Sequence, residues 1–279
     1  MNTFFRTTTL ALCSAFVLMA AAVPAHADQA TPARTTFDGQ IRNNSLALSP
    51  DEATAVVSYS ERPDVIVYDL ATNSVRGVRN GYASSTVTRL DTASGQARAV
   101  ITGFAQPRQG LRLSPDGAKL YVTNFLGDKL SIVDTQTDKI EAEIAGFNKI
   151  RAISVTADGK TLFAANSGSN DIAVVDIGAR RITSMVAVGR DPYGAALAPD
   201  GRQIYAGNLA DNSVSVIDVA TPKVVATITG FKQPRQAIVF TRDGRFAYVL
   251  NEDLSLAKVE RGAQRIVGGI APAPASTKN

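Results

Sequence analysis

The sequence predicts an all-β fold built from repeated four-stranded antiparallel units. Short runs of strand-forming residues follow one another about every 8–12 residues, with no helical period between them. One segment recurs along the chain, and each copy carries the same turn residues. A period near 42 residues that contains four short strands is typical of a β-propeller, in which each repeat forms one blade.

The repeat is clearest in four copies of one segment. They read LRLSPDGAKLYVTN (111–124), ISVTADGKTLFAAN (153–166), AALAPDGRQIYAGN (195–208) and IVFTRDGRFAYVLN (238–251). Their turn aspartates are 42 or 43 residues apart, and a more divergent copy starts at Leu46. A β-sandwich is the rival architecture, but a sandwich gives no reason for a strict repeat.

Each copy predicts its strands in order. The first strand alternates apolar with small or polar residues, as at Leu111 and Leu113, which indicates one buried face. A Pro-Asp-Gly turn follows, in which Pro presets φ and Gly supplies a positive φ. We expect the second, third and fourth strands at residues 120–123, 130–134 and 140–144. The aspartates of the turns are predicted to be turn formers, and the asparagines that end the second strands to cap the following loops.

Residues 121–124, Tyr-Val-Thr-Asn, resemble the signature of the YVTN-type β-propeller repeats of exported bacterial and archaeal proteins. Around this signature, residues 114–124 read Ser-Pro-Asp-Gly-x-x-Leu-Tyr-Val-Thr-Asn and residues 131–135 read Ser-Ile-Val-Asp-Thr, and the resemblance covers roughly residues 46–270. It implies a propeller but not a function, because such proteins do many things on one scaffold. It also implies seven blades as the usual number, and seven repeats of this length would need more residues than the mature chain would have.

The blade count that we expect is about five full blades plus a half blade. Asp69 and Asp91 occupy equivalent positions in third strands, yet they are only 22 residues apart. Residues 86–101 therefore predict a half blade without its first two strands. Either the ring has five or six blades, or residues 35–44 complete the half blade.

The N-terminus predicts a secretory signal peptide over residues 1–27. Arg6 precedes an apolar stretch, and Ala25-His26-Ala27 has the small-x-small cleavage pattern. A membrane anchor is the alternative, but the stretch is short for a bilayer span. We expect an N-terminal segment at residues 28–45, the propeller at 46–270 and a disordered tail at 271–279. No transmembrane segment is expected in the mature chain, which we predict to be a soluble monomer, either periplasmic or secreted.

The residue types exclude much catalytic chemistry. The only cysteine is Cys13 and the only histidine is His26, so the mature chain would have neither. This excludes a Ser-His-Asp triad, a cysteine nucleophile and a histidine-ligated metal. We expect no cofactor; an oxygen-ligated cation such as Ca²⁺ is the one that the remaining side chains allow, with Asp171, Asp191 and Asp211 as loop acids that could gather. The formal net charge of +4 is mild, so no nucleic-acid partner is indicated.

The links between successive blades carry the candidate ligand-binding residues. Aligned by repeat, one link position holds Arg108, Arg151, Tyr193 and Arg235, and Gln109 and Gln236 follow two of the arginines. In a propeller this position lies at the mouth of the central channel. Guanidinium forks there would suit a carboxylate or phosphate. The alternative is that these arginines are solvated or pair with acids of a neighbouring blade.

The function that this predicts is an exported binding or scaffold module for an anionic ligand or an acidic partner that the sequence does not identify. We predict no catalytic residues. A carboxylate- or divalent-cation-dependent hydrolase or lyase is the first alternative. A structural component of the envelope is the second.

Overall fold

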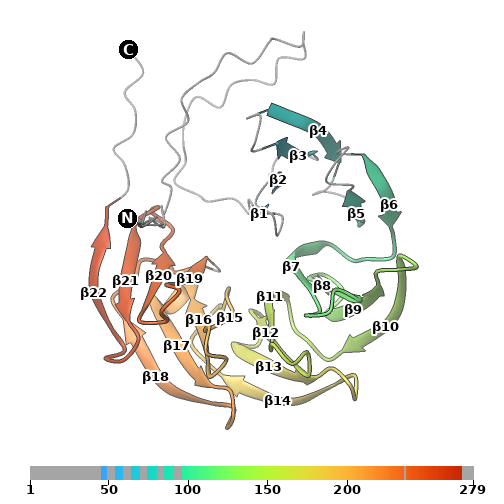
Figure 1. Cartoon of the computed structure of the whole chain (residues 1–279). Helices are drawn as coiled ribbons and strands as arrows, with labels where there is room; N and C mark the ends of the chain where they lie inside the picture. Colours follow the sequence, from blue (N-terminus) through green and yellow to red (C-terminus); the bar gives the residue numbers. More distant parts are fainter. Residues whose placement is uncertain are drawn as a thin grey trace, which may run out of the picture. The chain divides into compact units, whose positions relative to one another are not determined.

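Short antiparallel strands make up nearly all the regular structure of the computed structural model (Figure 1). The structure describes residues 45–48, 54–58, 64–69, 74–80, 85–90, 96–235 and 237–271, without the side chains of residues 45–80, 90, 108 and 109. The predicted signal peptide therefore lies outside the described residues, as do nearly all of segment 28–45 and of the tail 271–279. No helix in the described part has the length and apolar character needed to cross a membrane.

The described strands form five four-stranded antiparallel sheets and one two-stranded sheet. The four-stranded sheets are β1–β4 (Ser45–Leu48, Thr54–Ser58, Asp64–Asp69, Ser74–Asn80), β7–β10 (Pro107–Leu113, Lys119–Asn124, Lys129–Asp134, Lys139–Ala145), β11–β14 (Ile150–Val155, Thr161–Asn166, Asp171–Asp176, Arg181–Ala187), β15–β18 (Ala196–Leu197, Gln203–Asn208, Ser213–Asp218, Lys223–Thr229) and β19–β22 (Ile238–Phe240, Phe246–Leu250, Leu256–Glu260, Arg265–Ile270). The two-stranded sheet is β5 (Val87–Leu90) with β6 (Ala97–Ile101), and a short 3-10 helix, η1 (Leu209–Asp211), precedes β17. The predicted β-propeller fold is confirmed: these residues form five full units and a half unit.

The two-stranded sheet corresponds to the third and fourth strands of a unit. In the full sheets a register shift interrupts the ladder between these two strands, for example between Val174 and Val175 of β13. The pair β5–β6 has the same shift, between Arg89 and Leu90. Val87 packs against the apolar side chains of the next unit. The half unit therefore lacks its first and second strands among the described residues.

The core lies between successive sheets. One apolar cluster joins Tyr121 and Leu130 of the sheet β7–β10 to Ile153 and Leu162 of the next sheet, and an equivalent cluster joins the sheets β15–β18 and β19–β22. The second and third strands of the sheets β7–β10, β11–β14 and β15–β18 are buried along most of their length because both of their faces are covered. In the last sheet, β20 and β21 alternate between buried and partly buried residues. The fourth strands β10, β14 and β18 alternate between exposed and less exposed residues, as outer strands with one solvated face do.

The predicted buried face of the first strand is wrong for β7. Leu111 and Leu113 are 38% and 57% exposed, whereas Ile153 and Ile238, the equivalents of Leu111 in β11 and β19, are buried. Those isoleucines pack on the inner strands of the preceding sheet. The sheet that precedes β7 is the half unit β5–β6, which has no inner strands among the described residues. The leucines therefore lack the cover that the repeat gives their equivalents.

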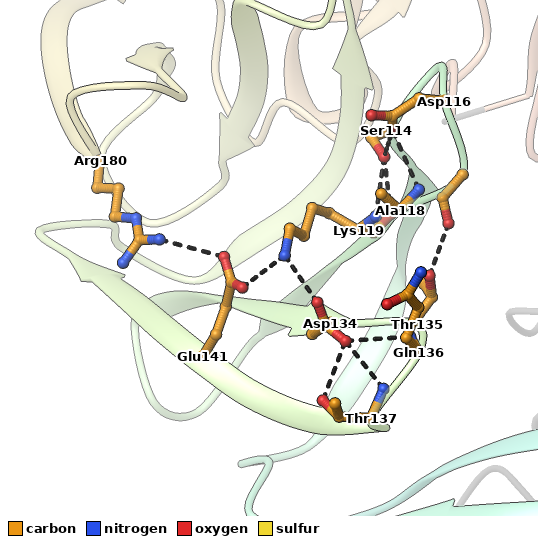
Figure 2. A network of polar contacts seen from close by, with 11 residues as sticks. Ser114, Asp116, Ala118, Lys119, Asp134, Thr135, Gln136, Thr137, Glu141 and Arg180 are labelled. Carbon is orange, nitrogen blue, oxygen red and sulfur yellow. Dashed lines mark hydrogen bonds and ion pairs between the residues drawn. The ribbon is translucent and has the colours of Figure 1, made fainter.

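Carboxylates organise the turns at one end of the sheets, as Figure 2 shows for the sheet β7–β10. Lys119 Nζ donates to Asp134 Oδ2 (2.9 Å) and to Glu141 Oε2 (2.6 Å), and Arg180 of the next sheet donates to Glu141 Oε1 (3.2 Å). The hydrogen bond from Lys119, followed by those from Thr137, holds the pKa of Asp134 well below its usual range. This network joins two neighbouring units at their turns.

The predicted role of the repeated turn aspartates is confirmed. Asp116, Asp158 and Asp243 each accept a hydrogen bond from a hydroxyl two residues earlier, at 2.5 to 2.6 Å. Each also accepts from a backbone N–H two residues later, at 3.0 Å. The side-chain hydrogen bond, more than the backbone one, lowers the pKa of each of these carboxyls.

Candidate functional site

The links between successive sheets lie beside the loops that join second and third strands. In three units the first residue of the loop donates its backbone N–H to a link carbonyl: Phe125 to Gln106, Ser167 to Lys149 and Leu209 to Asp191, at 3.0 to 3.3 Å. In the last unit the second residue of the loop, Glu252, donates to Lys232 at 3.0 Å. We call this end of the sheets the link face. It consists of the links at residues 102–106, 146–149, 188–195 and 230–235 and the loops at residues 125–128, 167–170, 209–212 and 251–255.

Buried asparagines at the ends of the second strands fasten three of the links to their own units. Asn124 Oδ1 accepts the N–H of Ala105 (2.8 Å), and Asn251 Oδ1 accepts the N–H of Lys232 (3.0 Å). The amide group of Asn124 also donates to the hydroxyl of Ser131 (2.9 Å) in the third strand. The predicted structural role therefore holds: the amide group of Asn251 donates to Ser255 Oγ (2.9 Å) in the following loop, and the amide oxygens cap the link as well.

A second set of side chains fastens three of the links to the preceding unit. Three loop residues accept the N–H of a link residue 21 positions later: Asp128 from Lys149 (2.6 Å), Asn170 from Asp191 (2.9 Å) and Asn212 from Gln233 (2.8 Å). All six residues have positive φ angles, between 47° and 62°. We call these three pairs the Asx latches. Sequence reasoning missed them, although an Asp or Asn recurs every 42 residues at this loop position.

The links bring three of the predicted ligand-binding side chains together. Arg151 Cζ lies 3.7 Å from the centroid of the Tyr193 ring, and Arg235 Cζ lies 5.4 Å from the same centroid. The backbone N–H of Tyr193 donates to Gly207 O (2.8 Å), which fixes the base of the ring. Both guanidiniums gain a cation–π contact with the ring. We call these residues the Arg–Tyr–Arg cluster.

Acidic side chains accompany both arginines of the cluster. Arg235 Nη2 donates to Glu252 Oε1 (2.8 Å), and Arg235 Nε forms an ion pair with Glu252 Oε2. Arg151 Nη2 lies 3.8 Å from Asp191 Oδ1, and its guanidinium also lies 5.0 Å from the centroid of the Phe125 ring. The side chains of both arginines are only 14% exposed. The cluster therefore presents guanidiniums that are held in place by rings and carboxylates.

Two glycines allow the backbone of the arginines to approach the neighbouring unit closely. A Cβ atom at Gly110 would lie 2.4 Å from the carbonyl oxygen of Arg151, and one at Gly207 would lie 2.7 Å from the carbonyl oxygen of Arg235. No real side chain tolerates such contacts, so both positions depend on the missing Cβ. Sequence reasoning did not single out either glycine.

The other predicted ligand-binding residues are only partly within the described structure. Arg108 and Gln109 belong to β7, but their side chains lie outside the described atoms, and Gln236 lies outside the described residues. Two further link cations have acidic partners: Arg190 Nε donates to Asp211 Oδ1 (2.6 Å), and Lys232 Nζ donates to Asp253 Oδ2 (2.8 Å).

The three loop acids do not gather into a cation site. Asp171 accepts from the amide of Asn166 (2.8 Å), Asp191 lies beside Arg151, and Asp211 pairs with Arg190. The backbone N–H of Arg190, followed by its side chain, lowers the pKa of Asp211. Within the described part of the chain, no three Asp, Glu, His or Cys side chains lie close enough together to hold a metal ion.

Comparisons with known proteins agree with this architecture. The model of a family described as "Lactonase, 7-bladed beta-propeller" matches residues 131–235. Among solved structures, a hydrazine synthase from Kuenenia stuttgartiensis is similar over 85% of this chain and 67% of its own, with 23% sequence identity and a TM-score of 0.57. No curated protein sequence matches. At this level of identity the structural likeness concerns the fold alone, and the chain has the fold of a β-propeller.

Proposed function

We propose that this β-propeller is a binding module that takes an anionic ligand, or an acidic segment of a partner protein, at the Arg–Tyr–Arg cluster. One observation carries the proposal: Arg151 and Arg235, from different repeats, meet at the ring of Tyr193. A guanidinium offers a planar fork of donors that matches a carboxylate or phosphate. Contact with the ring limits the orientations of that fork, and partial burial strengthens its attraction for an anion.

The proposal includes further donors and a cellular setting. Arg108, Gln109 and Gln236 belong to the same or the next link position and are proposed to extend the site.

We also propose that the repeats are of the YVTN type and that the chain is exported to the periplasm or secreted as a monomer. N-terminal sequencing of the mature protein should then start at Asp28, and light scattering on a size-exclusion column should give the monomer mass.

Binding to poly-L-glutamate tests the site. The double variant Arg151→Ala/Arg235→Ala should bind the immobilised polymer about tenfold more weakly than the wild type, since two fork contacts are lost. The triple variant with Arg108→Ala should bind still less. The matched control is Arg202→Ala/Arg242→Ala, which removes the same charge from exposed arginines in the turns at the other end of the sheets. Equal weakening by both double variants would mean that net charge, and not the cluster, attracts the polymer.

A lactone-hydrolysing enzyme is the second candidate function, because the lactonase family model matches residues 131–235. This candidate predicts acid release from a panel of lactones in a pH-stat assay. We expect no turnover above the rate of spontaneous hydrolysis, with or without added Ca²⁺. Turnover that a chelator abolishes would establish the enzyme instead.

A further inference from the structure

Glu252 holds the Arg235 guanidinium in the way that a bound carboxylate would. Its Oε1 accepts from Arg235 Nη2 at 2.8 Å, and its Oε2 pairs with Arg235 Nε. The pair thus combines one hydrogen bond with one ion-pair contact between the same two planar groups. The two side chains are only 14% and 17% exposed, so the pair is largely shielded from water.

The loop that carries Glu252 does not need an acid for its own fold. The equivalents of Glu252 by backbone hydrogen bond are Leu126, Gly168 and Ala210, which donate to Ala105, Asn148 and Arg190 as Glu252 donates to Lys232. Neither these residues nor Phe125, Ser167 and Leu209, which precede them, are acidic. The carboxylate of Glu252 is therefore specific to the last unit, and the contact that distinguishes it is the one with Arg235.

The charged surroundings of this pair are nearly balanced. Lys232 and Asp253, in the same link and loop, pair with each other at 2.8 Å. Across the Tyr193 ring, Arg151 lies near Asp191. The fork of Arg235 is therefore the cationic group to which Glu252 is dedicated.

We infer that the Arg235 fork is a carboxylate subsite and that Glu252 is its internal occupant, which an incoming carboxylate displaces. This inference rests on the proposed function, whose anionic ligand it narrows to a carboxylate. The planar carboxylate of Glu252 already occupies the Arg235 guanidinium, and the Tyr193 ring lies beside that guanidinium. The internal carboxylate competes with the ligand, so its removal should strengthen binding rather than weaken it.

The first test compares two single charge removals in one loop. Glu252→Gln keeps the side-chain volume and should tighten binding to poly-L-glutamate by about fivefold or more, because a neutral amide competes less well for the guanidinium. Asp253→Asn removes one negative charge at the next residue, as Glu252→Gln does, and should alter binding less than twofold. Adding Arg235→Ala to Glu252→Gln should cancel the gain. Equal tightening by Glu252→Gln and Asp253→Asn, or no tightening by Glu252→Gln, would overturn the inference, while binding by the wild type would leave the proposed function standing.

The second test fills the subsite with a small probe. Glu252→Ala should melt below the wild type, and acetate should restore part of the lost melting temperature. Inorganic phosphate at equal ionic strength should restore less, and the Arg235→Ala/Glu252→Ala variant should respond to neither. Rescue by acetate together with failure of every form to bind poly-L-glutamate would support the subsite and refute the proposed function. Equal recovery of the melting temperature with phosphate, or no recovery with acetate, would overturn the carboxylate assignment. If Glu252→Ala does not fold, the binding comparison with Glu252→Gln decides whether the subsite exists.

Discussion

At the scale of single residues, Tyr193 differs from the arginine of the other repeats and allows Arg151 and Arg235 to lie close together. The equivalent link positions of the other three units hold Arg108, Arg151 and Arg235. A fourth arginine at position 193 would add a third positive charge beside Arg151 and Arg235. The tyrosine instead places the negative face of a π system against both guanidiniums. Tyr193 therefore lets two like charges share a small, partly buried volume.

The position of Arg235 also depends on Gly207, which gives the first prediction. Gly207→Ala places a methyl group 2.7 Å from the carbonyl oxygen of Arg235, so the link must shift. We expect a loss of about 1–3 kcal/mol in the free energy of unfolding, the usual cost of overpacking. Binding at the cluster should weaken as well. Urea unfolding measures the first effect and polymer binding the second.

The control for this glycine is Gly262→Ala, because no atom lies within 4 Å of the Cβ that it would add. It should leave the urea midpoint unchanged. A neutral Gly207→Ala would show that the link backbone yields at no cost.

The sequence predicts which residues meet at the cluster but not how their charges are balanced. Repeat alignment places Arg151, Tyr193 and Arg235 at one structural position, and the structure brings them into contact. The ion pair between Arg235 and Glu252 depends on side-chain rotamers in one unit that the other units do not share. No repeat pattern could therefore indicate it.

At the scale of elements, the links 146–149 and 230–235 are fixed from two sides. The asparagine at the end of the second strand holds each of these links to its own unit, and an Asx latch holds it to the preceding one. The link 188–195 is held by the latch of Asn170 and by the backbone hydrogen bond from Tyr193 to Gly207. Tyr193 follows a latched residue, Asp191, by two positions. The latches therefore help to set the distance between the side chains of the cluster.

The latch formed by Asn170 gives the second prediction. Asn170 has a φ of 62° and accepts the N–H of Asp191. Asn170→Ala loses this acceptor and places Ala in a left-handed conformation, so we expect a loss of about 1–3 kcal/mol in unfolding free energy. Asn170→Gly keeps the conformation and should lose about half as much. Asn170→Asp keeps the acceptor and should be close to neutral in thermal melts; a large loss in the Asp variant would contradict the latch.

The repeated turns give the third prediction, which concerns pH. Hydrogen bonds from Ser114, Thr156 and Thr241 lower the folded-state pKa values of Asp116, Asp158 and Asp243. A lowered pKa means that the folded state binds fewer protons than the unfolded state near pH 4, so stability rises with pH there. The contribution of these aspartates to stability should be complete above about pH 5. It should be lost as the pH falls through about 4, the unfolded-state pKa, towards the lower folded-state pKa values. Urea midpoints between pH 7 and pH 2.5 would follow it.

A matched pair of variants isolates the cause of this pH dependence. Thr156→Ala/Thr241→Ala removes the hydroxyl donors from Asp158 and Asp243 and should flatten the fall in stability between pH 5 and pH 3. Thr183→Ala removes a hydroxyl that donates only to the carbonyl of Val174, so it should leave the slope unchanged. An unchanged slope in the double variant would mean that other carboxylates govern the acid sensitivity.

At the scale of the whole molecule, the repeat allowed the β-propeller fold to be predicted, together with the five four-stranded sheets and the two-stranded sheet that the described residues form. It could not predict the exposure of Leu111 and Leu113, because burial at those positions depends on the preceding unit rather than on the strand itself. Leu111 and Ile153 stand at the same position of first strands that alternate in the same way. The cover differs, since β5–β6 lacks inner strands among the described residues.

This difference between equivalent positions gives the last prediction. Ile153 is fully buried between two sheets, whereas Leu111 is 38% exposed. Ile153→Ala should therefore cost about 2–5 kcal/mol of unfolding free energy, the range for a buried aliphatic side chain that leaves a cavity. Leu111→Ala should cost less than about 1 kcal/mol, because water already reaches much of its surface. Paired urea titrations measure both values, and equal losses would mean that Leu111 is covered in solution by a part of the chain, or by a partner, beyond the described residues.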